Sequence, residues 1–296
     1  RHIIPYFENA DLTISDIERD DIQEFYKYLA RGSPEKKALS PTMIKRVHSM
    51  LKMIFNYAID GNIIVKNPCL RTKRPKPPRR KANFYSSEEC RELFRCLEGT
   101  EIYDLVRVTV MFGLRRSEVL GLKWSAVDLE KDVLSICYTI TKMKNEVIES
   151  DRTKSNSSIR SFVIEPSLHQ LFVSLKAKEE ENRAFFGNTY YENDFVFKQP
   201  NGQPFDPNHV SNKFSYLLKK NNLRHIRFHD LRHSCASILY EMKYGVKEIQ
   251  EWLGHSDPRI TLSTYTHLFK GQVDNVARQL ADVFFDDENT DEIIEK

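Results

Sequence analysis

The chain has 296 residues, of which 40% are hydrophobic and 29% are charged, so it is long enough for two folded domains and has an ordinary globular composition. Its net charge of +3 is too small to indicate a nucleic-acid partner by itself. No apolar run reaches the roughly eighteen residues of a transmembrane helix, and no signal peptide is recognisable. The five cysteines form no Cys-x-x-Cys pair, which favours a protein of the reducing cytoplasm without a disulfide framework.

Residues 1–70 are expected to form a helical domain. Apolar residues from Ile14 to Leu29 are spaced for one buried helix face. Ser40-Pro41 is a strong helix start, because a capping hydroxyl precedes a proline in the first turn. The helix that follows carries an apolar stripe and is expected to stop at Gly61. The stripe consists of Ile44, Val47, Met50, Leu51, Ile54, Phe55, Ala58 and Ile59.

Another face of this second helix is polar and partly basic. Its candidate DNA-binding residues are Lys45, Arg46, His48 and Lys52. On most helices such residues form a solvated face. The basic segment that follows makes a contact with a DNA groove the alternative interpretation.

Residues 71–83 are expected to be the linker between two domains. Prolines interleaved with basic residues favour an extended backbone that buries no core. The segment is either a solvated linker or a strap across DNA phosphates, and its seven basic side chains without an acid from 71 to 81 favour the strap. These side chains are Arg71, Lys73, Arg74, Lys76, Arg79, Arg80 and Lys81.

The second predicted domain comprises residues 84–296. Ser86 or Ser87 can cap a first helix, and residues 102–122 form a long apolar helical stretch broken at Gly113. The sequence GLRRSE at 113–118 interrupts that apolar stretch. Arg115 must therefore meet an anion or a carboxylate, and Glu118 and Asp128 are internal candidates. Arg116 is expected to be a surface residue.

Strands are predicted after this helical stretch. Residues 132–141 alternate between polar and apolar side chains, as in a half-buried strand, and further strands are expected at about 145–153 and 160–164. A polar turn from Lys154 to Ser158 separates the last two. A lysine in such a turn is usually just exposed to solvent.

Helices dominate the remainder of the chain. They are predicted at 166–183, at 207–221 and at 272–285, and a short strand is predicted at 194–198. The last helix precedes an acidic tail at 286–296.

The most informative stretch runs from Arg227 to His267. It contains His229 and Arg232, whose spacing of three places both on one helix face, followed by His255 and then Tyr265 ten residues later. Short helices are predicted between these residues, joined at Gly245 and Gly254. A guanidinium and an imidazole beside one hydroxyl nucleophile would suit chemistry on a phosphodiester.

Metal and nucleotide chemistry are not expected. His229 and His233 have a metal-like spacing, but no further Cys or His pair accompanies them, so His233 is interpreted as a core or helix-face residue. The phosphate-binding pattern GxxxxGK[ST] is missing from the sequence. We therefore expect no metal site and no cofactor.

Several of these residues together resemble the tyrosine recombinase family, which includes phage integrases and Xer resolvases. The GLRRSE segment is similar to the family's first arginine motif, Thr153-Lys154-Ser155 to its lysine-bearing hairpin, and the stretch 227–267 to its C-terminal motif. The resemblance implies a mainly α fold with a small antiparallel β-sheet. That fold combines a helical, SAM-like core-binding domain with a mixed α+β catalytic domain.

The resemblance also implies roles for these residues. Tyr265 would be the nucleophile, His229 its general base, Lys154 the acid that protonates the departing 5′-hydroxyl, and His255 a donor to a non-bridging oxygen. Arg115 and Arg232 would bind the phosphate, because a guanidinium stays charged and can contact two oxygens at once. Glu118 would orient the basic groups.

The function implied is site-specific DNA recombination through a covalent 3′-phosphotyrosine, in the integration and excision of a mobile element. The sequence looks most like integrases of conjugative transposons, which usually carry an additional arm-binding domain that would precede Arg1. The expected partner is double-stranded DNA, at the element ends and at the target site. Four copies of the chain would form a tetramer on two duplexes, with the C-terminal helix exchanged between subunits. An excision factor is a further expected partner, and the location would be the bacterial cytoplasm, at the nucleoid. Alternatives are a Xer-like resolvase, a type IB topoisomerase-like enzyme and a non-catalytic DNA-binding regulator.

Overall fold

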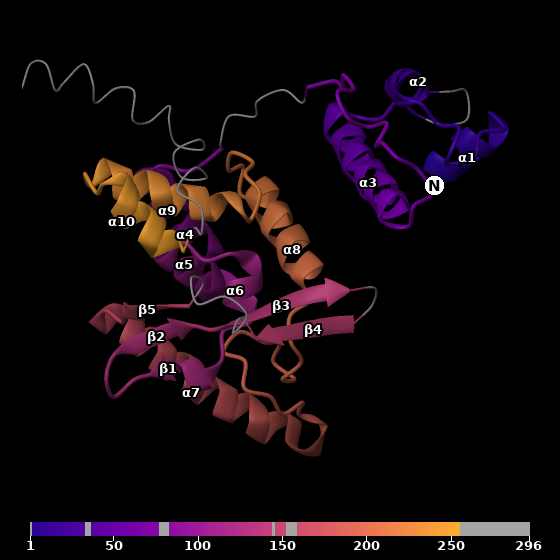
Figure 1. The fold of residues 1–296 in the computed structure, drawn as a ribbon. Coiled ribbons are helices and arrows are strands. Elements are labelled where there is room, and N and C mark those ends of the chain that lie inside the picture. The colour runs from indigo at the N-terminus through magenta and orange to yellow at the C-terminus, as the bar shows by residue number, and fades with distance from the viewer. Residues whose placement is uncertain (1, 33–36, 77–82, 144–145, 152–158, 255–296) are drawn as a thin grey trace, which may run out of the picture. The chain divides into compact units, whose positions relative to one another are not determined.

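The structure is a computed structural model that describes residues 2–32, 37–76, 83–143, 146–151 and 159–254. The chain forms two compact units, Arg1–Lys81 and Ala82–Lys296, each of which is described here by itself (Figure 1). In the described part of the chain, no helix is both long and apolar enough to cross a membrane. Several predicted features lie outside the described residues, namely Arg79, Arg80, Lys81, Lys154, His255, Tyr265 and the helix at 272–285.

The N-terminal unit contains the helices α1 (Ile3–Asn9), α2 (Arg19–Arg31) and α3 (Pro41–Asp60). The Ser40 side chain accepts a hydrogen bond from the backbone N–H of Met43, and α3 ends at Gly61, so both predicted helix ends are confirmed. Phe25 of α2 and Phe55 of α3 are each at most 1% exposed and belong to one apolar core.

The predicted apolar stripe on α3 is too wide. Ile44, Leu51 and Phe55 are buried as expected, but Met50 is 57% exposed and Ile54 is 40% exposed. The described helices of this unit cover only a narrow strip of α3, so positions beside that strip remain in contact with solvent.

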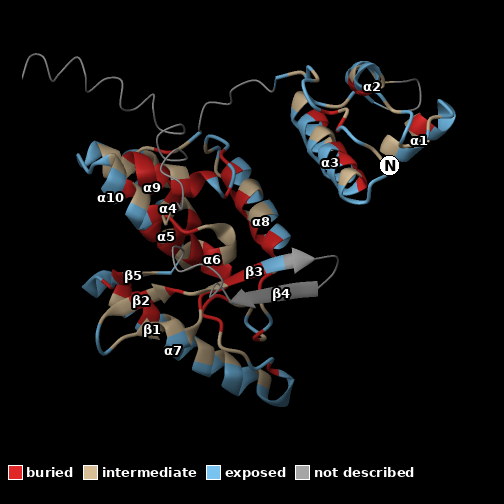
Figure 2. Cartoon of the chain, in the orientation of Figure 1, coloured by how far each residue is buried: buried red, intermediate tan, exposed pale blue. Residues whose placement is uncertain are grey.

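The C-terminal unit is mainly helical with a small antiparallel sheet, as predicted. Its helices are α4 (Ser87–Leu97), α5 (Tyr103–Phe112), α6 (Arg116–Leu120), α7 (Pro166–Phe186), α8 (Pro207–Lys220), α9 (Asp230–Glu241) and α10 (Val246–Leu253), with the 3₁₀ turns η1 (Trp124–Ala126) and η3 (Gly187–Thr189). The buried residues concentrate on α5, α6 and α9 (Figure 2). These helices therefore form the packed centre of the unit.

Two small sheets flank this helical centre. Strands β1 (Val127–Asp128), β2 (Val133–Ile136) and β5 (Arg160–Val163) pair antiparallel in the order β1-β2-β5, while β3 (Tyr138–Met143) pairs antiparallel with β4 (Glu146–Asp151). Phe162 of β5 contacts Phe112 of α5, with ring centroids 4.8 Å apart. The three-stranded sheet is thereby packed against the central helix.

Two predictions about strands were wrong in detail. The single strand expected at 132–141 is interrupted at Cys137, because β2 and β3 pair with different partners. The strand expected at 194–198 forms only the isolated bridges Lys123↔Phe195 and Lys198↔Pro204. No described strand lies beside this segment to extend a ladder.

Candidate active site

The turn between α5 and α6 brings an arginine to the centre of the unit. Gly113 ends α5 in the left-handed conformation, with φ of +59°, and a Cβ placed there would lie 2.5 Å from Cδ2 of Leu253. Only glycine meets both conditions without strain. The chain then turns into α6 with Arg115 as its N-cap residue.

Glu118, one turn into α6, is fully buried and binds two arginines. Its carboxylate accepts hydrogen bonds from Nη1 of Arg115 at 2.6 Å, from the backbone N–H of Arg115 at 2.9 Å, and from Nη2 of Arg160 at 2.8 Å. Burial by itself would raise the pKa of Glu118, but the charge of Arg160 and then that of Arg115 hold this pKa well below its ordinary value. The carboxylate therefore stays ionised and fixes both guanidinium groups.

Arg232 of α9 reaches the same carboxylate. Its Nη1 atom donates to the carbonyl oxygen of Gly113 at 2.7 Å and lies 4.0 Å from Oε2 of Glu118. The side chain is 2% exposed. The structure thus brings together three of the predicted site residues, Arg115, Glu118 and Arg232, although more than a hundred positions separate Arg115 from Arg232.

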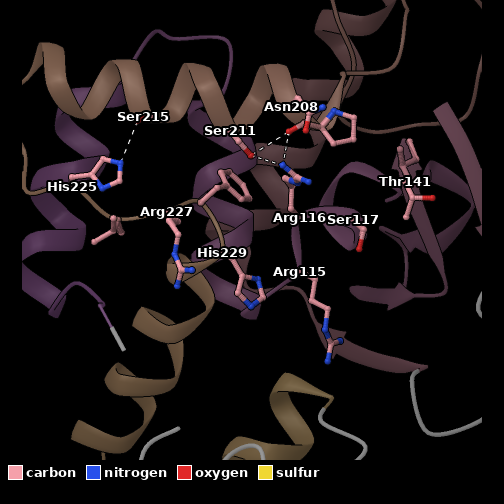
Figure 3. A pocket seen from close by; sticks show the side chains of 14 residues that line it. Arg115, Arg116, Ser117, Thr141, Asn208, Ser211, Ser215, His225, Arg227 and His229 are labelled. Carbon is pink, nitrogen blue, oxygen red and sulfur yellow. Dashed lines mark hydrogen bonds between the residues drawn. The ribbon is translucent and has the colours of Figure 1, made fainter. Parts of the chain in front are cut away.

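His229 stands at the N-terminus of α9 and lines the same cavity as Arg115. The cavity has a volume of about 820 Å³ (Figure 3). Surrounding protein atoms and then the charge of Arg232 lower the pKa of His229 below its ordinary value, although the ring is exposed. A neutral imidazole at this place can accept a proton near neutral pH.

Arg116 also lines the cavity, contrary to the prediction that it is a plain surface residue. It is half-buried, and its Nη1 atom donates to the carbonyl oxygen of Pro207 at 2.9 Å and to Oγ of Ser211 at 2.6 Å. Figure 3 shows its side chain pointing away from that of Arg115, toward α8. Arg116 therefore ties α6 to α8.

Arg160 was not among the predicted site residues. The alternation of side chains along the strand could have identified it. Arg160 lies on the same face of β5 as the buried Phe162, and it pairs across the sheet with the buried Ile136. An arginine on an otherwise apolar strand face requires a buried anion. Glu118 supplies that anion.

Lys154, His255 and Tyr265 lie outside the described residues, so their positions stay predictions. The described residue next to His255 does reach the arginine cluster. Gly254, which precedes His255, accepts a hydrogen bond from Nη2 of Arg115 at 3.2 Å through its carbonyl oxygen. Within the described residues, no group of three His, Cys, Asp or Glu side chains has a geometry that could hold a metal ion.

The candidate DNA-binding residues of the N-terminal unit fall into two kinds. Lys45, Arg46 and Lys52 are exposed on α3, whereas His48 is half-buried and its Nδ1 atom lies 2.7 Å from the hydroxyl of Tyr26. Burial and then Arg74 lower the pKa of His48. The ring of His48 therefore contributes to packing within the unit.

The first half of the basic segment is attached to this unit. The backbone N–H of Lys73 donates to Gln23 of α2 at 2.8 Å, and the carbonyl oxygen of Lys73 accepts from the Gln23 amide at 2.6 Å. The side chains remain exposed at Arg71, Lys73, Arg74 and Lys76. This segment thus has a fixed backbone with basic side chains directed to solvent.

Comparisons with known proteins match this chain to the same family that its site residues resemble. Residues 84–272 match the model of the phage integrase family, and residues 1–74 match the phage integrase SAM-like domain. A XerC-like tyrosine recombinase of Caldanaerobacter subterraneus subsp. tengcongensis is 30% identical, over 96% of this chain and 76% of the relative. The ICEBs1 integrase of Bacillus subtilis is also 30% identical, over 96% of this chain and 75% of the relative.

Solved structures share the fold. The Tn1549 transposon integrase in complex with transposon right end DNA superimposes with a TM-score of 0.73 at 20% identity, covering 93% of this chain and 92% of that one. The XerH site-specific recombinase in a post-cleavage complex gives 0.67 at 20% identity, covering 93% and 76%. With the two family models matched in order along the sequence, the chain belongs to the phage integrase family, and it is a DNA recombinase of the tyrosine recombinase type.

Proposed function

We propose that this chain is the integrase of a mobile genetic element, which cuts and rejoins double-stranded DNA at specific sites to integrate and excise that element. The observation that carries the proposal is the convergence of Arg115 and Arg232 on one buried carboxylate, with Arg115 and His229 lining one large cavity. Two cations and a neutral base are the groups that phosphoryl transfer requires. The similarity to the ICEBs1 integrase supports the assignment to a mobile element.

The two arginines would bind the scissile phosphate. Phosphoryl transfer adds negative charge to the oxygens in the transition state, so a fixed guanidinium stabilises that state more than the substrate. Arg115 is 29% exposed and lines the cavity. Because Arg232 is 2% exposed, a phosphate reaches it only after the atoms that cover it move aside.

The chemical step would transfer one phosphate ester to another. The phenol oxygen of Tyr265 forms a bond to phosphorus, the bond from phosphorus to the 5′-oxygen breaks, and the 3′ end stays attached as a phosphotyrosine. His229 takes the phenol proton, Lys154 gives a proton to the 5′-oxygen, and His255 donates to a non-bridging oxygen. The bond energy is retained, so a 5′-hydroxyl of another strand can reverse the step without ATP.

The assembly proposed is four copies of the chain on two duplexes, with the C-terminal helix at 272–285 exchanged between neighbours. Lys45, Arg46 and Lys52 on α3 and the basic side chains of residues 71–81 would contact DNA phosphates. An excision factor would set the direction of the reaction. This assembly would act on DNA in the bacterial cytoplasm.

A strand-exchange assay with two duplexes tests the proposed function. The substrates are duplexes that tile the DNA flanking the protein's own gene, one labelled and one not. We expect hybrid products that combine strands of both duplexes. Relaxation of supercoiled DNA without hybrid products would instead indicate a topoisomerase-like enzyme, and binding without cleavage would indicate a regulator.

A Xer-like resolvase is the second candidate, because the XerC-like relative is as similar as the ICEBs1 integrase. The same assay separates the two. A resolvase recombines two copies of one site, whereas an integrase of a mobile element joins an element end to a different target sequence. Hybrid products only between identical sites would favour the resolvase.

The salt dependence of DNA binding tests the basic segment. We expect the paired substitution Lys73→Ala with Lys76→Ala to flatten the slope of log K against log salt by about two, since each neutralised phosphate contributes roughly 0.9. The backbone contact of Lys73 with Gln23 is kept by alanine. Titrations at several salt concentrations measure the slope.

The matched control is Lys176→Ala with Lys178→Ala, two exposed lysines on α7. Both side chains are exposed on α7, and no DNA contact is proposed for them, so the slope should not change. An equal slope for both paired variants would show that the basic segment does not contact DNA phosphates.

A further inference from the structure

Arg160 is a buried arginine to which the proposed chemical step gives no role. Its side chain is 9% exposed, and its guanidinium lies over the ring of Phe162, 5.5 Å from the centroid. Its Nη2 atom donates to Oε2 of Glu118 at 2.8 Å. Arg160 therefore shares with Arg115 the carboxylate on which the candidate site is built.

Arg160 also contacts the second group that holds Arg115. Gly254 ends α10 in the left-handed conformation, with φ of +65°, and a Cβ placed there would lie 2.8 Å from Nη1 of Arg160. The Gly254 carbonyl oxygen accepts from Nη2 of Arg115 at 3.2 Å. The Arg160 guanidinium thus packs against both anchors of Arg115, the carboxylate and the Gly254 turn.

Charge explains why a third arginine is useful here. Glu118 alone would neutralise one of the two arginines proposed to bind the phosphate. With Arg160 included, three guanidinium groups share the one carboxylate. Each of them is then neutralised less by Glu118, and a transition state with extra negative charge on its oxygens is stabilised better by a less neutralised guanidinium.

Arg160 differs in position from Arg115. Arg115 lines the large cavity with His229, whereas Arg160 lines a separate hollow with Phe112, Glu251 and Trp252. A phosphate in the cavity would meet Arg115 first. The effect of Arg160 on the phosphate therefore passes through the groups it holds.

We propose that Arg160 is a positioning residue, which acts through Glu118 and the Gly254 turn to aim Arg115 at the phosphate and to leave its charge available. This inference rests on the proposed function. It gives β5, the strand that follows Lys154 in the sequence, a contribution to the site that is independent of the lysine. It also predicts energetic coupling between Arg160 and Glu118.

The test is a double-mutant cycle on the rate of covalent adduct formation. The substrates are nicked suicide duplexes that tile the DNA flanking the protein's own gene, used at saturating protein. Arg160→Met should lower the rate constant about 10- to 100-fold, a loss typical of residues that orient a reactive group, with little change in Kd for DNA. In the Glu118→Gln background the same substitution should cost much less.

Arg160→Lys and Arg183→Met complete the design. Lysine keeps the charge but cannot contact the carboxylate and the Gly254 turn together, so its rate should lie between those of wild type and Arg160→Met. Arg183 pairs with Glu179 and Glu192 and lines neither hollow. Arg183→Met should form adduct at the wild-type rate.

The outcomes separate this inference from the proposed function. If the wild-type chain forms no adduct on any duplex, the proposed function fails. The positioning role is overturned if wild type forms adduct and Arg160→Met forms it equally fast. It is also overturned if Arg160→Met lowers the rate constant by the same factor in the Glu118→Gln background as in wild type. Should Arg160→Met not fold, Arg160→Lys decides, because an unchanged rate for that variant also overturns the role.

Discussion

Tyr265→Phe should form no covalent adduct on a nicked suicide duplex, while its Kd for DNA stays at the wild-type value. Phenylalanine keeps the ring and removes only the oxygen that would attack phosphorus, and no bond to phosphorus can form without it. The adduct is measured as a band of reduced mobility on a denaturing gel, and the modified peptide is identified by mass spectrometry. This is the largest effect that we expect, because the loss is complete.

A matched control is Tyr244→Phe, which removes the same atom from a tyrosine that is 44% exposed in the C-terminal unit. That variant should form adduct at the wild-type rate. An adduct that persists in Tyr265→Phe, with the label on another tyrosine, would assign the nucleophile elsewhere and leave the arginine cluster in place. Loss of adduct in both variants would point to a general defect in folding or DNA binding.

Local signals in the sequence predicted the scaffold of the site well. The Ser40-Pro41 pair marked the start of α3, and Gly113 marked the break between α5 and α6. Both signals depend on backbone chemistry within a few residues, which is why they can be read from the sequence. Glu118 and Asp128 were the two expected partners of Arg115, and the structure selects Glu118, three residues away, whereas Asp128 pairs with Lys131.

Long-range pairing could not be predicted from such signals. The alternation across 132–141 is continuous, yet β2 pairs with β5 while β3 pairs with β4. Alternation reports which face of a strand is buried and carries no information on its partner. For the same reason Arg160 was missed, since its importance depends on Glu118, a residue 42 positions away.

Exposure on α3 was mispredicted for a related reason. Helical spacing shows that Met50 and Ile54 could join the apolar face, but burial depends on how many helices pack around α3. With only α1 and α2 sharing its core among the described helices of this unit, α3 leaves Met50 and Ile54 partly exposed. The width of an apolar face is therefore a tertiary property.

Arg115→Ala should lower the rate constant of adduct formation by about 10²–10³, the usual cost of removing one fixed donor to a developing oxyanion. The reason lies in its surroundings, because Glu118 and the Gly254 carbonyl hold the guanidinium in one orientation at the cavity wall. A group fixed in advance requires no reorganisation during the reaction. The loss should appear in single-turnover measurements at saturating protein, where weaker DNA binding no longer affects the rate.

Arg107→Ala is the control for this substitution. Arg107 is 31% exposed and pairs with Asp104 three positions away, much as Arg115 is 29% exposed and pairs with Glu118, but it does not line the cavity. Its removal should leave the rate constant unchanged. If the rate constant of Arg115→Ala is within a few fold of that of Arg107→Ala, the pair of Arg115 with the buried carboxylate serves only the stability of the fold. The phosphate would then have to be bound by other residues.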